Sequence, residues 1–243
     1  MGRGARWTTA LAVLFLAGKG DAAPKLAPVR HARIVERTPP RLLDLPNAPA
    51  VSDVEKVPWA ADLPAIDVNN PKTSVRAKLR LYADDGTMNR AALRTFMEVA
   101  SSESDLPDRP DGEVAEPLDP RLVQLAFRAA YKFGGKPLVI VSATRKRAHG
   151  KHRTGEALDF KVDGVRTATL ASYLRTFPRA GVGIYTHPKT QYVHLDVRDR
   201  SFHWLDASPP GVTWRERRLP DRTQEKRDTS YTTLLDLPEP AWK

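Results

Sequence analysis

Four short apolar runs between residues 137 and 198 constrain the fold of this chain more than any other feature. The runs "PLVIVSATR", "EALDFKV", "GVGIYT" and "QYVHLDV" have the length and the β-branched content of strands. One segment of helical spacing, "TATLASYLRTF", separates the second run from the third. Strands that follow one another this closely favour an antiparallel sheet.

Two helical patterns precede these runs. "NRAALRTFMEVAS" has apolar residues at helical spacing, and so has "LDPRLVQLAFRAAYKFGGKP", in which Asp119 suits the N-cap, Pro120 the first helical position and Gly134–Gly135 the stop. A further strand is expected in "SVRAKLRLYADDGTMN". The sequence therefore predicts a single α+β domain over residues 74–208, with a small antiparallel sheet flanked by helices.

The segments on either side lack such periods. Residues 24–71 hold nine of the 21 prolines, so residues 23–73 are expected to form an extended linker or arm. Residues 209–243 are polar and charged, which predicts a tail on the surface or in solvent.

The N-terminus resembles a secretory signal peptide. Arg3 and Arg6 precede the apolar run "TTALAVLFLAG", and "KGDAA" offers a cleavage site after Ala22. Removal of residues 1–22 takes away three basic residues and one acidic residue, which lowers the formal charge from +10 to +8. No later segment is apolar enough to cross a membrane, so a periplasmic or secreted protein is expected.

The chain has no cysteine, so any metal must be held by His, Asp or Glu. The net positive charge favours an acidic partner: nucleic acid, anionic lipid or an anionic wall polymer. The basic run "RKRAHGKHR" lacks the interleaved aromatics of a base-stacking surface, and export removes the protein from nucleic acid. A wall polymer is therefore the expected partner.

One set of residues has the chemistry of a metal site. In "YVHLD", Tyr192, His194 and Asp196 project from the same face of a strand, and Asp159 can meet His194 if the two strands pair. His152 would reach in from the preceding loop, where Gly155 allows a sharp turn. Two histidines and a carboxylate can bind zinc and leave a fourth position for water, as in catalytic sites.

The order "SATR", His152, Gly155, Ala157, Asp159, His194 and Asp196 resembles the zinc D-Ala-D-Ala metallopeptidases of the lysostaphin/D-alanyl-D-alanine peptidase/hedgehog type. It is most similar to their branch of periplasmic murein endopeptidases. The resemblance covers residues 74–206 and implies a Zn²⁺ cofactor on His152, Asp159 and His194. It also implies that Arg145 binds the substrate.

The chain departs from the family pattern at several positions. The usual Gly-Tyr before the arginine is Ala143–Thr144, and Gly150 stands where a serine is usual. Many members have a catalytic carboxylate three residues before the last ligand, where this chain has Gln191. Asp196 is the substitute that we expect as general base.

His203 is a candidate general acid, although a core or surface histidine beside Trp204 explains it equally well. The resemblance predicts hydrolysis of a peptide bond in peptidoglycan. Two alternatives are a peptidoglycan-binding module that keeps the fold without hydrolysis, which Gln191 motivates, and a basic nucleic-acid-binding protein.

Overall fold

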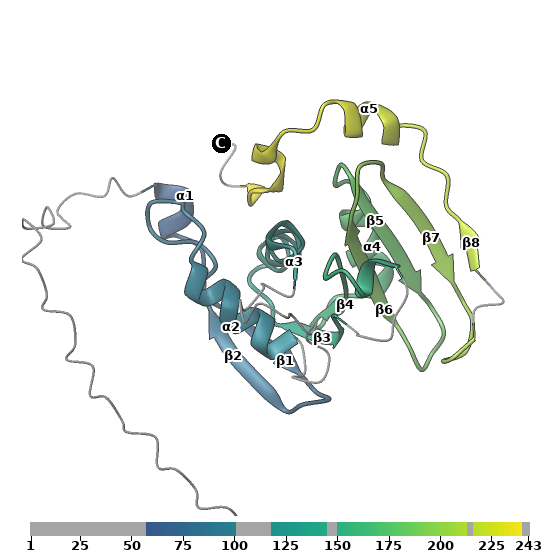
Figure 1. Ribbon diagram of the computed structural model, residues 1–243, viewed down its shortest axis with the longest axis horizontal. Helices are drawn as coiled ribbons and strands as arrows, with labels where there is room; N and C mark the ends of the chain where they lie inside the picture. Colours follow the sequence, from purple (N-terminus) through teal and green to yellow (C-terminus); the bar gives the residue numbers. More distant parts are fainter. Residues whose placement is uncertain (1–56, 101–117, 145–149, 213–215, 240–243) are drawn as a thin grey trace, which may run out of the picture. The chain divides into compact units, whose positions relative to one another are not determined.

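The computed structural model describes residues 57–100, 118–144, 150–212 and 216–239, all of which belong to one unit of the fold. Within these residues, eight strands form one sheet in the order β2-β1-β3-β4-β6-β5-β7-β8. Figure 1 shows this sheet and its helices in sequence colours. The strands are β1 (Ile66–Asn70), β2 (Val75–Leu79), β3 (Leu138–Ser142), β4 (Ala157–Val162), β5 (Ala180–Tyr185), β6 (Tyr192–Val197), β7 (Phe202–Asp206) and β8 (Glu216–Arg218).

Helix α3 begins and ends where its capping residues predict. In α3 the Asp119 side chain accepts a hydrogen bond from the backbone N–H of Arg121 at 2.8 Å, and Pro120 opens the helix. Gly134 and Gly135, both at positive φ, follow its end. The helical elements are α1 (Pro58–Ala61), α2 (Arg90–Ala100), α3 (Pro120–Lys132), η2 (Gly150–His152), α4 (Thr167–Leu174), α5 (Gln224–Thr229) and η3 (Thr233–Asp236).

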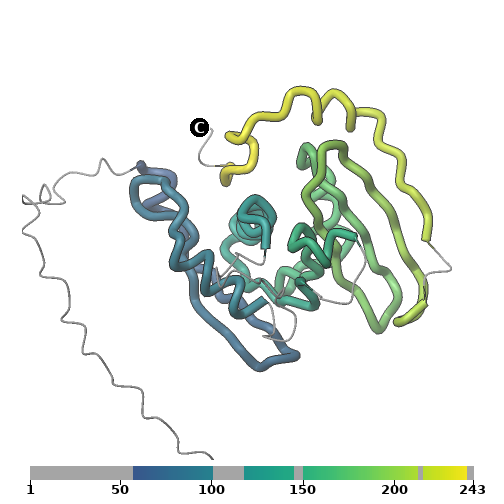
Figure 2. The backbone as a smooth tube through the Cα atoms, viewed as in Figure 1, coloured from purple at the N-terminus to yellow at the C-terminus, as the bar shows by residue number. Residues whose placement is uncertain are grey.

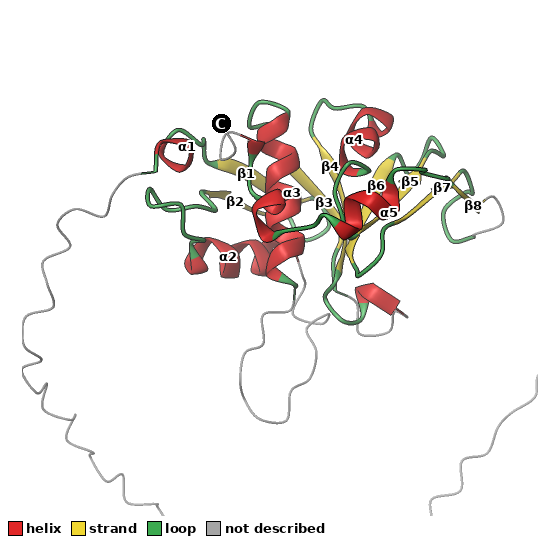
Figure 3. Cartoon of the chain, turned by 90° about the horizontal axis from the view of Figure 1, so that it is seen from above, coloured by secondary structure: helices red, strands yellow, loops and turns green. Residues whose placement is uncertain are grey.

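The core lies between one face of the sheet and the helices. Leu158, Phe160, Val193 and Leu195 are fully buried, and they occupy the alternate positions of β4 and β6 that face away from the predicted metal ligands. Helices α3 and α4 pack on β4 and β6, while α2 packs on β1 and β2. Figure 3 shows α2 and α3 lying beside each other over the sheet. This arrangement leaves the opposite face of β4, β6 and β5 for the site.

The predicted α+β class is confirmed, and the four runs that predicted an antiparallel sheet do pair antiparallel, but the sheet is not small and it is mixed. The sheet has eight strands within the described residues, and β1 pairs with β3, and β5 with β7, in parallel. The strands β3, β4, β6 and β5 form the antiparallel centre. Two strands can pair in parallel only if the chain between them crosses back to the end of the sheet where the first strand began. A short loop cannot make that connection, and in both parallel pairs other elements lie between the two strands in the sequence.

The sheet extends into both flanking segments. Strand β1 lies within residues 23–73, where Ile66 and Val68 are fully buried. Beyond residue 208, β8 pairs with β7, and Asp228 of α5 accepts hydrogen bonds from the backbone N–H groups of Arg179 and Ser201. Figure 2 shows the chain after β8 returning toward α3. These parts of the expected arm and tail are integral to the fold.

No helix in the described ranges has the length and hydropathy to span a bilayer. Residues 1–22, which carry the predicted signal peptide, lie outside the described residues.

Candidate metal centre

Strand pairing brings Asp159 and His194 together, as the sequence predicts. Strands β4 and β6 are antiparallel, and Asp159 stands directly opposite His194 in their register. Residues paired in this way project from the same face of a sheet. The Asp159 Oδ1 and the His194 Nδ1 atoms are 2.9 Å apart.

His152 reaches the same place from the short 3₁₀-helix η2. The backbone on either side turns at Gly150 and Gly155, whose φ angles are +67° and +75°, a region that favours glycine. The Nδ1 atom of His152 lies 2.7 Å from the carbonyl oxygen of Ala143. Since a carbonyl only accepts, Nδ1 carries the proton and Nε2 presents a lone pair to the site.

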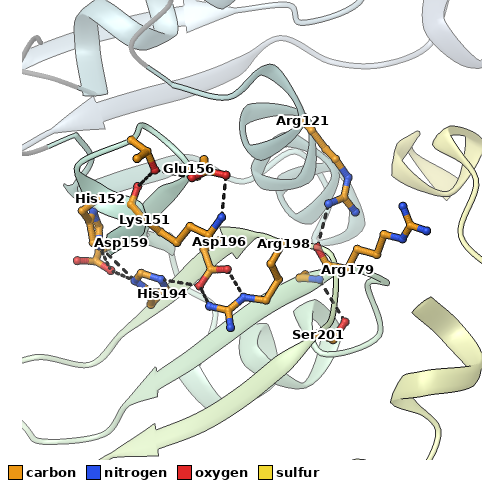
Figure 4. Close-up of polar contacts among 12 residues, drawn as sticks. Arg121, Lys151, His152, Glu156, Asp159, Arg179, His194, Asp196, Arg198 and Ser201 are labelled. Atoms are coloured by element: carbon orange, nitrogen blue, oxygen red, sulfur yellow. Dashed lines mark hydrogen bonds and ion pairs between the residues drawn. The ribbon is translucent and has the colours of Figure 1, made fainter. Parts of the chain in front are cut away.

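Three donor atoms form a small triangle (Figure 4). His152 Nε2 lies 3.2 Å from His194 Nδ1 and 3.4 Å from Asp159 Oδ1, and the third side measures 2.9 Å. Ligands at about 2.0–2.1 Å from a tetrahedral metal are about 3.3 Å apart. The triangle is therefore within a few tenths of an ångström of the size that a zinc-sized ion requires. We call His152, Asp159 and His194 the donor triangle.

The three residues of the donor triangle are buried: His152, Asp159 and His194 are 6%, 5% and 8% exposed. Buried titratable groups are costly unless they are paired or ligate a metal. Burial raises the pKa of Asp159, but the adjacent His152 and His194 rings outweigh it and hold that pKa far below its usual range. Burial likewise lowers the pKa of His194, yet its bonds to Asp159 and Asp196 raise it to about 9.

Asp196 contacts the opposite edge of the His194 ring. Its Oδ2 atom lies 3.1 Å from His194 Nε2, and both of its oxygens accept from the guanidinium of Arg198. Asp196 is 1% exposed, so its carboxylate is shielded from water, while the Arg198 side chain is 25% exposed. The contact holds a proton on Nε2 of His194, so Nδ1, whose proton a bound metal would displace, is the nitrogen that faces the donor triangle.

Two glycines of β5 make room for this arrangement. Their alternate positions face the site, and a Cβ atom at Gly181 would collide with Asp196 and Arg198. A Cβ atom at Gly183 would lie 2.5 Å from the Trp204 ring. Trp204 from β7 thus lies over Gly183, with its ring centroid 5.0 Å from that of His194.

Aromatic residues border the donor triangle on this face. Tyr185 and Tyr192 stack with their ring centroids 4.4 Å apart. Burial, together with the negative charge of Asp159, raises the pKa of Tyr185 to about 12. The hydroxyl therefore keeps its proton at neutral pH and can donate a hydrogen bond.

The structure does not test one predicted site residue, Arg145, which lies outside the described residues, and it places another, His203, away from the donor triangle. His203 neighbours Trp204 on β7 and so projects from the opposite face, where its Nδ1 accepts from Arg175 Nε at 3.3 Å. The structure therefore places His203 in the covered side of the sheet, which removes its geometric basis as a general acid.

The sequence interpretation missed Arg198, Trp204 and the paired glycines. The pattern H-x-D-x-R placed Arg198 on the same strand face as the histidine and aspartate. The spacing G-V-G in "GVGIYT" likewise indicated two small residues on one face.

The family model described as Peptidoglycan L,D-endopeptidase MepK matches residues 82–204, just over half of the chain. No curated protein and no solved structure matches significantly. The matched region contains the whole donor triangle, together with Asp196 and Trp204. The chain therefore belongs to this family of peptidoglycan endopeptidases, within the zinc D-Ala-D-Ala peptidase superfamily.

Proposed function

We propose that this protein is a zinc-dependent peptidase that hydrolyses a peptide bond in peptidoglycan. The observation that carries the proposal is the donor triangle, because its sides of 2.9–3.4 Å fit a tetrahedral metal with one position left open. Membership of a peptidoglycan endopeptidase family supplies the substrate class. A zinc ion bound there would supply an activated water and a Lewis acid for the scissile carbonyl.

The residues of the chain prepare this chemistry by fixing protons. The Ala143 carbonyl holds the His152 proton on Nδ1, and Asp196 holds the His194 proton on Nε2. His152 therefore presents an unprotonated Nε2 to the open centre of the donor triangle, and His194 would present Nδ1 once a metal displaced the proton that its raised pKa retains there. Asp159 is ionised over the whole neutral range, as its lowered pKa requires.

Asp196 was expected to act as the general base, and its contacts favour another role. Both of its oxygens are engaged by Arg198, and one also accepts from His194. It lies behind the His194 ring, on the side away from the donor triangle. We therefore assign Asp196 as a positioning residue for His194.

Arg145 keeps the role that the resemblance implies. It follows β3 by three residues, in the segment that leads to His152. A guanidinium there would bind a carboxylate or a carbonyl of the substrate through two parallel hydrogen bonds.

Export agrees with this substrate. The signal-like segment of residues 1–22 would deliver the protein to the compartment that contains peptidoglycan. A positively charged mature chain suits a wall polymer that carries carboxylates.

The second candidate is a peptidoglycan-binding module that retains the fold but does not hydrolyse. Gln191 favours it, because an exposed amide stands where many relatives have a catalytic carboxylate. The donor triangle can still be catalytic without a carboxylate at position 191 if another group accepts the proton from the attacking water.

Digestion of purified peptidoglycan sacculi separates the two candidates. The mature protein is incubated with sacculi after treatment with a chelator, with and without added zinc, and the released muropeptides are separated. New muropeptides that require zinc and disappear in His152→Ala would support hydrolysis. Sedimentation of the protein with sacculi without new products would support the binding module instead.

A further inference from the structure

The face that carries the donor triangle continues across three more strands to the edge of the sheet. The strand registers place Asp159, His194, Gly183, Trp204 and Arg218 in one row perpendicular to the strands. Directly paired residues share a face, so all of them belong to the face of the site. Gly183 has no side chain, and Trp204 fills the space above it. An unbroken surface therefore links His194 to Arg218.

Two residues before Trp204, on the same face of β7, Phe202 contacts two guanidinium groups. The Arg198 Cζ atom is 5.7 Å from the ring centroid and the Arg218 Cζ atom is 5.4 Å from it. Phe202 and Trp204 are alternate residues of β7, and their ring centroids are 5.8 Å apart. The rings form a wall that leads from the donor triangle to Arg218.

The two arginines differ in whether a carboxylate forms an ion pair with them. Arg198 is neutralised by buried Asp196. Arg218 is exposed, and no carboxylate forms an ion pair with it within the described ranges. The acidic residues nearest along this face, Glu216 and Asp206, stand opposite each other two residues along from Arg218 and Trp204, and neither forms an ion pair with Arg218. Arg218 therefore presents a positive charge that is held in place by an aromatic ring.

The length of the row fits a short peptide. Strands β6, β5, β7 and β8 are neighbours, so three strand spacings separate His194 from Arg218, about 14 Å in all. An extended peptide covers about 3.3 Å per residue, so about four residues span this distance. A peptide whose scissile bond lies at the donor triangle can thus place a carboxylate beside Arg218.

We propose that Arg218, together with Phe202 and Trp204, forms a subsite that binds a carboxylate of the peptidoglycan stem peptide, about four residues from the scissile bond. The subsite rests on the proposed function for its substrate class. Its arginine comes from β8, beyond residues 82–204 that match the family, so the C-terminal segment contributes to substrate recognition in this chain. An arginine suits this role because its planar guanidinium binds a carboxylate with two hydrogen bonds.

The neighbouring Arg217 offers a matched control. It is equally exposed on the same short strand, but it projects from the opposite face. The variants Arg218→Ala and Arg217→Ala remove the same charge from adjacent positions. They therefore differ in the face that loses the guanidinium and not in net charge.

The experiment compares both variants on a soluble cross-linked peptide and on the same peptide with its free carboxylates amidated. On the free acid we expect Arg218→Ala to lower kcat/KM about 10- to 100-fold, mostly through KM, with unchanged zinc content. Arg217→Ala is expected to match the wild type. Amidation should lower wild-type kcat/KM and remove the difference between wild type and Arg218→Ala. Equal kcat/KM for the two variants, or an equal loss by Arg218→Ala on both peptides, would overturn the subsite.

Calorimetric binding of an uncross-linked stem tetrapeptide separates this subsite from the proposed function. If the protein cleaves nothing but binds the tetrapeptide in a manner that requires Arg218, the subsite stands and hydrolysis fails. If the protein cleaves its substrate and Arg218→Ala binds and cleaves like the wild type, hydrolysis stands and the subsite fails. Absence of both cleavage and binding would overturn both.

Discussion

The Nε2 atom of His194 lies 3.1 Å from Oδ2 of Asp196, while Nδ1 of the same ring faces the donor triangle. This contact determines which nitrogen of His194 is free to bind a metal. Arg198 in turn holds the Asp196 carboxylate from its other side. Arg198 therefore holds Asp196, and Asp196 orients the His194 ring toward the candidate metal centre.

Replacement of Asp196 by asparagine tests this connection. We expect the affinity for zinc to fall about 10- to 100-fold, because the charge that orients the His194 ring is lost. Competition with a chromogenic chelator measures it, and Asp199→Asn, at an exposed position three residues on, is the control. Unchanged zinc affinity with turnover lowered by roughly 10²–10⁴-fold would instead establish Asp196 as the general base.

Gly181→Ala tests the same contact without altering a charged group. The added Cβ atom would collide with Asp196 and Arg198, so we expect zinc affinity to fall as it does in Asp196→Asn. Gly211→Ala is the control, because a Cβ atom there meets nothing within 4 Å although φ is +85° and the substitution is strained. A Gly181→Ala protein with wild-type zinc affinity would show that the collision is relieved elsewhere.

His203 predicts a dependence of stability on pH. Burial, followed by the positive charge of Arg175, lowers its pKa to about 4, below the value of about 6.5 in an unfolded chain. Between these values the unfolded state binds the proton, so the free energy of unfolding falls as pH falls, by up to about 1.4 kcal/mol per pH unit. Above pH 6.5 this contribution is constant.

Urea unfolding at several pH values between 4 and 7.5 measures the effect. The variant His203→Gln cannot titrate there, so we expect its stability to depend less steeply on pH than that of the wild type. Identical slopes would mean that His203 titrates alike in the folded and unfolded states, so that burial does not lower its pKa. Zinc-dependent turnover at neutral pH is expected to survive in this variant, because His203 lies on the covered face of the sheet.

Arg145→Lys tests the substrate-binding role that the resemblance implies. Lysine keeps the charge but loses the second hydrogen bond, so kcat/KM should fall while zinc content stays near the wild-type level. Arg147→Lys in the same basic run is the control. If both variants cleave as the wild type does, Arg145 is an ordinary member of that run.

The sequence predicted that Asp159 and His194 would meet, because side chains alternate between the two faces along each strand and this alternation places both residues on the face opposite the core. Their strands also have apolar residues on the other face, which fixes the register once the core forms. His152 could be added because it precedes Gly155, whose positive φ turns the loop toward the sheet. These features are local, and local periodicity predicts them.

Other parts depended on contacts between distant segments. Strand β8 consists of Glu216, Arg217 and Arg218, all exposed, so its sequence carries no apolar alternation, and only pairing with β7 makes it a strand. Strand β1 stands in a proline-rich region that suggested a linker. The face that His203 occupies is set by the register of β7 against β5, because aromatic residues stand on both sides of it in "SFHW".

The zinc content of the dialysed protein tests the central claim most directly. Mass spectrometry of the metals in the mature chain should find about one zinc per chain in the wild type and none in His194→Ala, with circular dichroism showing that the variant is folded. A wild-type protein without zinc, or a folded His194→Ala protein that retains one zinc per chain, would contradict the assignment of the donor triangle.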